Sequence, residues 1–489
     1  MPSSRLAETV AAHGDSRPHH TALHLNDQAV TYGRLRELTR SLRGELSKLN
    51  LAPGSTVCVP AHKTPQTIAL LLAVFHEGHI ALAPSPDLGS AALGHLAQQA
   101  RVSHLLTAAG DGVLSAEPVT AQEDAAQGFT VPDPGSAQLL LTTSGSTGTP
   151  KIVPIEAAGF DAFADWAAGE FALSPGEVAL SYAPLNFDLA LLDVWTFLRL
   201  GACVVLVDRQ RATDAAHLAA LTARHRVSFV QGVPMMYRLL LEHGGSFTAV
   251  RHAVFTGDRM PQDLLRRVTP AFPAAAFHNV FGCTETNDSF IHRVDPATLA
   301  GPMPIGRPIR GTQALVLDAE GGHLTSAGTG ELLVSTPFQT RGYLRRELNE
   351  TAFTQLEGRT FYRTGDIVTR TPEGLYFLEG RADWHVKVRG VRTNLQEVEN
   401  VIAAHPDVAE AVVVPLPDPQ AGVRLHAHVT HRPGSDLTGL RLRTHLGRHL
   451  PRHAIPSSVH LTDTPLPRTS TGKPDRNLIK QNHLKESDA

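Results

Sequence analysis

The stretch Leu139–Lys151, with the sequence LLLTTSGSTGTPK, constrains the fold more than any other part of the chain. Three apolar residues that favour a strand run directly into ten small hydroxylated, glycine, proline and lysine residues. Hydroxyls and the backbone N–H groups of a glycine-rich turn donate well to phosphoryl oxygens, and Lys151 adds a positive charge. The segment is not a GxxxxGK[ST] loop, because Pro150 precedes Lys151 and Ile152 follows it. The pattern predicts a strand that ends in a phosphate-binding loop. A mobile Ser/Gly linker would explain the composition but not the lysine.

Strand-like and helix-like segments alternate on both sides of this loop. Short apolar runs predict buried strands, and apolar positions at helical spacing predict helices. Strands separated by helices favour an α/β fold with parallel, doubly wound sheets, whose ligands bind at the carboxyl ends of the strands. The expected helices are residues 35–49, 65–75, 160–171, 189–200 and 214–224, the last capped by Asp214, and the expected strands include residues 56–60, 102–107, 178–181, 203–207 and 227–230.

The chain has 489 residues, which is too long for a single core, so at least two domains are expected. From about Pro302 the sequence changes to short β-type segments separated by glycine turns, which predicts a small β-barrel-like subdomain over residues 302–380. The core domain is therefore assigned to residues 1–380, and a small C-terminal α+β domain to residues 384–489. The expected elements of that second domain are a helix at 395–404, strands at 408–414 and 425–429, and a final helix.

Composition excludes several classes of protein. A net charge of −3 gives no reason to expect nucleic acid as a partner, and the longest apolar run is far too short to cross a membrane. Three scattered cysteines form no CxxC pair and no signal peptide is visible, so a reducing cytoplasmic location is expected. The 26 histidines include no HExxH spacing, and His20 and His24 fit a surface pair, so no zinc site is assigned.

Nine motifs, spread in order over essentially the whole chain, resemble those of the adenylate-forming superfamily. Within it, the chain is similar to the adenylation domains of nonribosomal peptide synthesis and to the D-alanine to carrier-protein ligases. The motifs are VTYGRL, TTSGSTGTPK, APLNFDLALLDVW, NVFGCTET, IGRPIRGT, GELLVS with TRGYL, YRTGD, GRADWHVKVRGVR and STGKPDR.

The resemblance implies a reaction and a phosphate site. Such enzymes join a carboxylate to the α-phosphorus of ATP, release pyrophosphate, and pass the acyl group to a thiol, mostly by positioning groups and neutralising charge. The residues that would hold the β and γ phosphates are Thr143, Ser144, Gly145, Ser146, Thr147, Gly148 and Lys151.

The segment NVFGCTET would bind the rest of the nucleotide. Asn279 would hydrogen-bond adenine, and Phe281, where the family usually has tyrosine, would stack on it beside Gly282. Thr284 would meet the α-phosphate. Glu285 would bind Mg²⁺, a hard cation that prefers carboxylate and phosphate oxygens.

The resemblance assigns three further contacts near the C-terminal part of the chain. Asp366 would accept hydrogen bonds from the ribose hydroxyls, and Arg381 would contact ribose or phosphate. Lys473 would bridge the substrate carboxylate and ATP, and with Thr284 and Lys151 it completes the predicted catalytic group. Asp383 stands where the family's small domain pivots, which predicts a hinge there. Taken singly, Asp366 or Arg381 would more often be a surface charge and Lys473 part of a tail, but their joint occurrence in family order makes that alternative remote.

The segment APLNFDLALLDVW carries the substrate signal. In amino-acid-activating relatives an aspartate at the position of Asp188 pairs with the substrate ammonium. The alternative role is a helix N-cap, since a helix is expected from Leu189. The residues expected to line the pocket are Leu189, Leu192, Gly232, Val254, Thr256, Val280, Asp288 and Ser289.

Two features of this pocket stand out. Four of its walls are apolar, and Gly232 is expected to leave room for the substrate. Asp288 stands where small apolar residues are common in the family. It either faces a second amine or a hydroxyl of the substrate, or it bonds Thr256 or Ser289, because an unpaired buried carboxylate is costly. Both α- and β-amino acids are candidates.

The expected function is activation of an amino acid and its transfer to the phosphopantetheine thiol of a separate carrier protein, in natural-product biosynthesis. The chain ends sixteen residues after Lys473 without a GGxS site. A basic stretch is expected to dock an acidic carrier or to be a solvated helix face; it contains Arg441, Arg443, Arg448 and Arg452. The alternatives are an acyl- or aryl-CoA ligase for a non-amino acid and a non-catalytic adenylate-binding regulator.

Overall fold

The computed structural model describes residues 4–119, 129–130, 133, 136–143, 151–297, 301–388, 391–418, 422–450, 452–469 and 473–487. The chain divides into two compact units. The first comprises residues 1–328, 332–364 and 370–377, and the second comprises residues 329–331, 365–369 and 378–489. The predicted boundary near residue 380 thus lies close to the start of the main part of the second unit, and the hinge at Asp383 stays a prediction. No described helix combines the length and apolar character that a membrane span requires.

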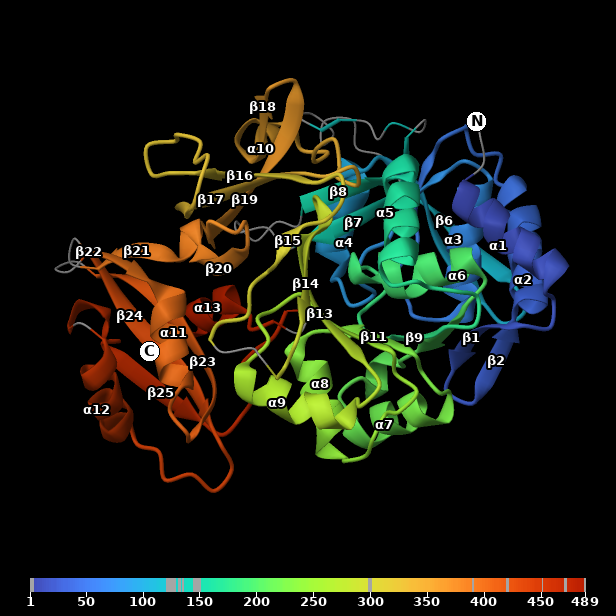
Figure 1. The fold of residues 1–489 in the computed structure, drawn as a ribbon. Helices are drawn as coiled ribbons and strands as arrows, with labels where there is room; N and C mark the ends of the chain where they lie inside the picture. The colour runs from blue at the N-terminus through green and yellow to red at the C-terminus, as the bar shows by residue number, and fades with distance from the viewer. Residues whose placement is uncertain are drawn as a thin grey trace. The chain divides into compact units, whose positions relative to one another are not determined.

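A nine-stranded sheet forms the larger part of the first unit (Figure 1). Its six central strands are parallel, and antiparallel strands close both edges. In sheet order the strands are β15 (Arg307–Pro308), β14 (Asn287–Val294), β13 (Ala276–Cys283), β12 (His252–Phe255), β11 (Phe229–Gly232), β9 (Val178–Ser181), β10 (Cys203–Leu206), β1 (Thr21–Leu25) and β2 (Gln28–Thr31).

A second sheet in the same unit has six strands and ends at the predicted phosphate loop. Its four central strands are parallel, and β7 pairs with β8 antiparallel so that Thr143 stands opposite Lys151. In sheet order the strands are β6 (Val113–Pro118), β5 (Val102–Ala109), β3 (Thr56–Cys58), β4 (Ile80–Leu82), β7 (Ala137–Thr143) and β8 (Lys151–Glu156).

Both faces of these sheets carry apolar side chains, and helices pack on the sheets to bury them. On β10, Val204 and Leu206 face one core, whereas Val205, and Val207 just after the strand, face another, as a doubly wound sheet requires. The helices of the unit are α1 (Arg5–Ser16), α2 (Tyr32–Ser47), α3 (Pro65–His76), α4 (Ser90–Gln99), α5 (Ala157–Glu170), η2 (Leu191–Thr196), α6 (Phe197–Leu200), η3 (Arg209–Arg211), α7 (Ala215–Arg224), α8 (Pro234–Glu242) and α9 (Gln262–Ala271).

These helices form layers. The first core contains α1, α2, α3, α5 and α6 between the two sheets, whereas α7, α8 and α9 cover the other face of the nine-stranded sheet (Figure 1). Helix α4 packs on the outer face of the six-stranded sheet. The Asp214 side chain accepts a hydrogen bond from the backbone N–H of His217 at 2.9 Å, so the predicted cap of α7 is confirmed. The predicted α/β class is likewise confirmed.

The predicted β subdomain is a five-stranded sheet. Strands β16 (Gln313–Leu317), β17 (Gly328–Ser335), β19 (Arg359–Arg370) and β18 (Phe353–Leu356) follow in that order, and β20 (Tyr376–Arg381) also pairs with β19. Helix α10 (Arg346–Ala352) leads into β18. Residues 365–369 of β19, which include Asp366, group with the second unit.

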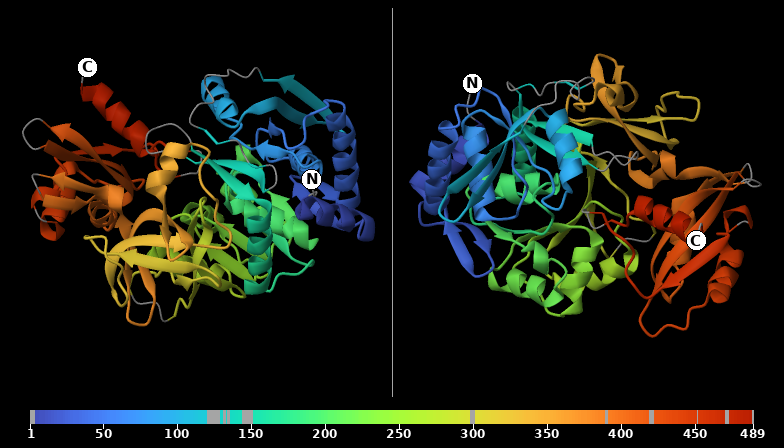
Figure 2. Two further views of the ribbon diagram at one scale, coloured as in Figure 1. Left: turned by 90° about the horizontal axis from the view of Figure 1, so that it is seen from above. Right: turned by 180° about the vertical axis from the view of Figure 1, so that it is seen from behind.

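The second unit is the predicted α+β domain. Its main sheet has the order β23 (Val408–Asp418), β24 (Gly422–His431), β25 (Ser458–Thr462), and β21 (His385–Val388) pairs separately with β22 (Val391–Asn394). Leu425, Ala427 and Val429 on β24 share a core with two of the unit's helices. The helices are η4 (Ala382–Trp384), α11 (Leu395–Ala403), α12 (Gly439–His449), η5 (Arg452–Ala454) and α13 (Arg476–Ser487). Figure 2 shows α13, in red, on the opposite face of this sheet from α11 and α12.

Candidate active site

Predicted substrate residues gather at one edge of the nine-stranded sheet. Asp188 follows β9, Gly232 ends β11, Thr256 follows β12, and Phe281 and Gly282 lie at the end of β13. These four strands are parallel neighbours, so their carboxyl ends meet at the same edge. The structure therefore brings together residues that are far apart in the sequence.

Two carboxylates and a threonine meet at this edge. The Thr284 hydroxyl donates to Oδ2 of Asp188 at 2.7 Å, so the residue expected at the α-phosphate touches the residue expected at the substrate ammonium. Burial, together with the nearby charge of Asp188, raises the pKa of Asp288 to about 7. A cation placed between the two aspartates would relieve this repulsion.

The remaining walls of the predicted pocket are mostly buried and apolar. Leu192, Val254 and Val280 are buried, and Leu189 is half-buried. Two polar residues of the predicted pocket, Thr256 and Ser289, are also buried. The Ser289 hydroxyl forms a hydrogen bond with the Thr286 hydroxyl at 2.9 Å. In the described part of the chain, no hydrogen bond joins the Asp288 carboxylate to either of them.

Gly232 does not provide the room that the sequence suggests. A Cβ atom at this position would lie 2.7 Å from the sulfur of Met236, so the Met236 side chain takes up the space beside the glycine. Met236 is fully buried on α8 and was not assigned to the pocket by its sequence. A flexible thioether at this place can change shape with the group it packs against.

Glu285, the predicted magnesium ligand, is buried and held by a tyrosine. The Tyr343 hydroxyl donates to its carboxylate, and the backbone N–H of Thr340 donates to the Glu285 carbonyl at 2.9 Å. Burial and the charge of Glu285 raise the pKa of Tyr343 well above its ordinary value, so the phenol stays a donor. The ammonium of Lys151 lies 5.0 Å from the centre of the Tyr343 ring.

The fold therefore places the lysine of the predicted phosphate loop close to Glu285. A carboxylate suited to Mg²⁺ beside a lysine suited to phosphate is a donor set that fits a magnesium–nucleotide complex. Tyr343 belongs to the TRGYL motif, to which the sequence alone assigned no contact. Ser144, Gly145, Ser146, Thr147 and Gly148 lie outside the described residues, and their phosphate contacts stay predictions.

Replacing Tyr343 with phenylalanine is expected to weaken the binding of ATP with Mg²⁺ about tenfold, because Glu285 loses the donor that orients it. Calorimetric titration with ATP at several Mg²⁺ concentrations measures this. Tyr376→Phe is the matched control, since it removes a buried tyrosine hydroxyl elsewhere in the same unit. An unchanged Mg²⁺ dependence in Tyr343→Phe would show that the tyrosine serves packing alone.

The predicted adenine contacts lie on β13. The Asn279 amide donates to the carbonyl of Pro304 at 2.8 Å, and the ring of Phe281 packs edge-to-face on Phe290 with centroids 5.9 Å apart. A Cβ atom on Gly282 would lie 2.2 Å from the Asn287 carbonyl oxygen, so the close return of β14 requires glycine.

Three predicted residues belong to the second unit. The Arg381 guanidinium donates to Oδ1 of Asp366 at 3.3 Å, which brings together the two groups assigned to the ribose. Lys473 is exposed, and its carbonyl accepts from the backbone N–H of Thr469 at 2.8 Å. The predicted catalytic lysine is thus carried by a different compact unit from Thr284 and Glu285.

A buried pair of charges that the sequence did not reveal supports Asp188. The Lys63 ammonium donates to the carbonyls of Ser181 and Tyr182, at the end of β9, at 3.0 and 2.9 Å. Its charge faces Asp193, which is fully buried in η2. Burial raises the pKa of Asp193 and lowers that of Lys63, while each charge stabilises the other. The segment that carries Asp188 is therefore anchored at both ends.

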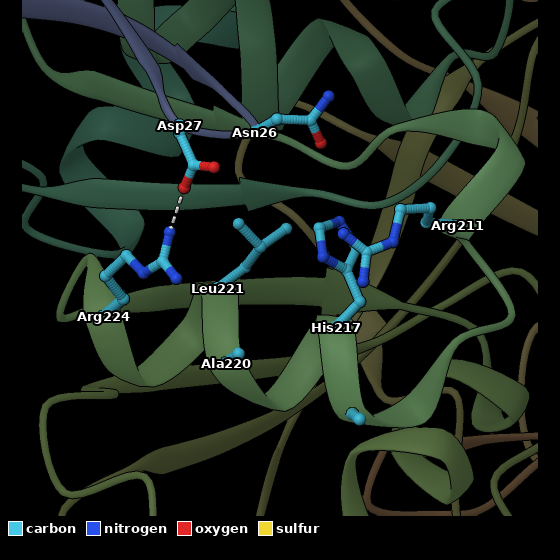
Figure 3. Close-up of a pocket in the computed structure, with 8 residues that line it drawn as sticks. Asn26, Asp27, Arg211, His217, Ala220, Leu221 and Arg224 are labelled. Carbon is cyan, nitrogen blue, oxygen red and sulfur yellow. Dashed lines mark hydrogen bonds and ion pairs between the residues drawn. The ribbon is translucent and has the colours of Figure 1, made fainter.

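A separate cavity of about 310 Å³ lies at the β1–β2 end of the strand order of the nine-stranded sheet (Figure 3). It lies between α7 and the β1–β2 turn, where Arg224 forms an ion pair with Asp27. His217, Leu221 and Arg211 also line it. None of the predicted site residues does, so this cavity is not the predicted active site.

Comparison with known proteins agrees with this geometry. The family model described as "AMP-binding enzyme" matches residues 10–344, and the model described as "AMP-binding enzyme C-terminal domain" matches residues 397–473. An L-proline--[L-prolyl-carrier protein] ligase of Pseudomonas fluorescens is 30% identical over 94% of this chain and 95% of its own length. A D-alanine--D-alanyl carrier protein ligase of Bacillus licheniformis is 26% identical over 98% of this chain and 99% of its own.

The fold is shared with solved structures as well. The crystal structure of ATP-bound MatB from Rhodopseudomonas palustris superposes with a TM-score of 0.82 over 98% of this chain and 99% of that chain, at 21% identity. The resemblance inferred from the nine motifs is thereby confirmed. The chain belongs to the AMP-binding enzyme family, with both the core and the C-terminal domain of that family.

Proposed function

We propose that the protein activates an amino acid with ATP and transfers it to the phosphopantetheine thiol of a separate carrier protein. Membership of the AMP-binding family supports the ATP-dependent chemistry, and the carrier-protein ligases among the relatives support the acceptor. The observation that carries the amino-acid part is Asp188, a carboxylate in contact with Thr284 at the edge where the reacting groups meet.

The electrostatics of this edge favour a substrate with a positive charge. Asp188 and Asp288 lie near one another among buried apolar walls, and burial, together with the charge of Asp188, raises the pKa of Asp288. An ammonium group would offset this repulsion, and in a partly dry pocket such an interaction is strong. A plain acyl or aryl acid would bring no positive charge to these two aspartates, so a CoA ligase for a non-amino acid is the less favoured alternative.

The proposed chemistry has two steps. An oxygen of the substrate carboxylate attacks the α-phosphorus of ATP, and the bond from that phosphorus to the pyrophosphate oxygen breaks, so pyrophosphate leaves with the electron pair. The carrier thiolate then attacks the carbonyl carbon of the adenylate, and AMP leaves. Lys473 and Lys151 would counter negative charge in the first step, Thr284 would orient the α-phosphate, and Mg²⁺ held by Glu285 would neutralise phosphate oxygens.

Pyrophosphate exchange across α-amino, β-amino and plain carboxylic acids tests this proposal. We expect exchange with at least one amino acid to exceed that with its deaminated analogue, because only the amine can pair with Asp188. Faster exchange with plain acids would overturn the amino-acid assignment and favour the CoA ligase. Exchange with no acid, despite ATP binding, would favour a regulator.

Asp288 gives a pH-dependent prediction. Its pKa is raised above the ordinary value, so its protonated form is favoured by folding, and wild-type stability falls as pH rises from about 4 through about 7. Replacing Asp288 with asparagine removes this loss. Asp288→Asn is therefore expected to gain about 1–2 kcal/mol over the wild type at pH 8 and little at pH 5, allowing for partial solvent access.

Urea unfolding at the two pH values measures this gain. The matched control is Asp258→Asn, which changes an exposed aspartate just after β12 in the same unit. If Asp288→Asn and Asp258→Asn gave the same pH profile, Asp288 would be a solvated charge and not part of a shared carboxylate site.

A further inference from the structure

Four histidines converge in the second unit, and none of them is among the residues assigned above. His426 and His428 occupy alternate positions of β24, and His460 lies beside them on β25, where its Cα is the register partner of His428. The intervening apolar residues of β24 face α11 and α12, so the histidines point to the opposite face of the sheet. That is the face covered by α13 (Figure 2).

Helix α13 supplies the fourth ring. His483 and Ile479 are four residues apart and both buried, so they share the helix face that meets the sheet. The ring centre of His483 lies 4.5 Å from that of His426, 4.6 Å from that of His460 and 5.2 Å from that of His428. One side chain of α13 is thus surrounded by three imidazoles of the sheet.

The nitrogen atoms are arranged like the ligands of a metal ion. One ring nitrogen each of His426, His460 and His483 lie within 4.8 Å of one another. Around Zn²⁺, with bonds of about 2.0–2.1 Å, tetrahedral nitrogen ligands are about 3.3–3.4 Å apart, so a small closure of side chains suffices. Among the residues that the structure describes, Nε2 of His428 is buried and has no hydrogen-bond partner.

The chemistry of the rings also suits a metal. Neutral imidazole nitrogen is a common metal ligand. The Ser458 hydroxyl is 2.7 Å from Nδ1 of His426 and 3.2 Å from Nε2 of His460, so it can fix the orientation of two rings. A set made only of imidazoles favours Zn²⁺ and similar transition metals over Mg²⁺.

We propose that His426, His460 and His483 form a binding site for a divalent transition-metal ion, which fastens α13 to strands β24 and β25. His428 lies beside the site and can serve as a fourth ligand. No short sequence motif predicts the site, because its ligands come from three separate elements of the chain.

The position of α13 gives the site a consequence for the enzyme. The helix begins three residues after Lys473, and the turn before it is closed by hydrogen bonds from Thr469 to the Lys473 carbonyl and from Asp475 to Pro467. At the other end of the same helix face, Arg476 pairs with Glu399 at 2.6 Å. Arg476 also donates to the Val413 carbonyl on β23 at 3.1 Å, so the start of α13 is held at the sheet. A metal at His483 would hold the other end of the helix there and steady the segment that follows Lys473.

Titration of the tag-free, chelator-treated full chain with Co²⁺ tests the site, because Co²⁺ bound by imidazoles in a tetrahedral site absorbs visible light. We expect one Co²⁺ per chain, displaced by Zn²⁺, and loss of the absorption band in His460→Asn and in His483→Asn. With 26 histidines in the chain, weak binding elsewhere is expected, so His449→Asn, an exposed histidine of α12, is the control that should keep the band.

Hydrogen exchange provides a readout that does not depend on absorption. Zn²⁺ is expected to slow exchange of the α13 amides in the wild type and in His449→Asn, but not in His460→Asn. His460 is partly accessible to solvent, so its replacement is not expected to unfold the domain. Three results would overturn the proposal. The wild type could show no visible band, the band could survive in His460→Asn and His483→Asn, or Zn²⁺ could leave the hydrogen exchange of α13 unchanged. The cluster would then be ring packing alone.

Discussion

Lys473→Ala is expected to lower the rate of adenylate formation by about 100- to 1,000-fold or more while leaving ATP binding within a few fold of the wild type. The reason is charge. Attack of a carboxylate on the α-phosphorus brings two negative groups together, and a positioned ammonium stabilises the transition state more than the bound nucleotide. Lys473 is exposed on the second unit, so the substitution creates no cavity. Pyrophosphate exchange and calorimetric ATP binding measure the two effects.

Two further variants make this result specific. Lys480→Ala removes a lysine of α13 in the same unit and should keep full exchange activity. Lys473→Arg keeps the positive charge but changes its shape, and partial activity is expected, because a planar guanidinium does not replace a point charge. Exchange by Lys473→Ala above a tenth of the wild-type rate would contradict the assigned role.

The sequence predicts the architecture well because the helices and strands depend mainly on local residue patterns. Strands with apolar residues on both faces and helices between them require a doubly wound sheet, and Asp214 caps its helix as local chemistry dictates. The helix expected over residues 189–200 is present, but its middle, η2, is π-helical. Asp193 is buried in η2 opposite Lys63, a contact between distant segments that no local pattern reports.

The site is predicted less completely, for the same physical reason. Motif spacing locates Asp188, Thr284 and Glu285, because each belongs to a segment that follows a strand. The contacts between them depend on how distant segments pack: Thr284 bonds Asp188 across 96 positions, and Tyr343 bonds Glu285 across 58. The room expected beside Gly232 is taken up by the side chain of Met236, four residues later on α8, which was not assigned to the pocket from the sequence.

Asp188→Asn is expected to reduce kcat/KM for the preferred amino acid by about 100- to 1,000-fold, with little change for its deaminated analogue. Breaking a buried ion pair by removing one partner costs about 3–5 kcal/mol, and each 1.4 kcal/mol is a factor of about ten. Asparagine keeps an oxygen that accepts the hydrogen bond from Thr284, which in the wild type is 2.7 Å long. The loss is therefore assigned to the charge and not to a displaced threonine. Pyrophosphate exchange with both acids measures the ratio.

The choice of asparagine also separates binding from capping. Asparagine and aspartate are about equally good at a helix N-cap, so a residue that only capped the following helix would give Asp188→Asn wild-type kinetics and stability. Alanine removes the charge, the cap and the acceptor for Thr284 together, and is expected to lower stability as well as selectivity. The two variants together have three possible outcomes. If both lose selectivity for the amino acid, Asp188 recognises the ammonium; if only the alanine variant loses it, Asp188 caps the helix or positions Thr284. If neither variant loses selectivity, the substrate amine is bound elsewhere.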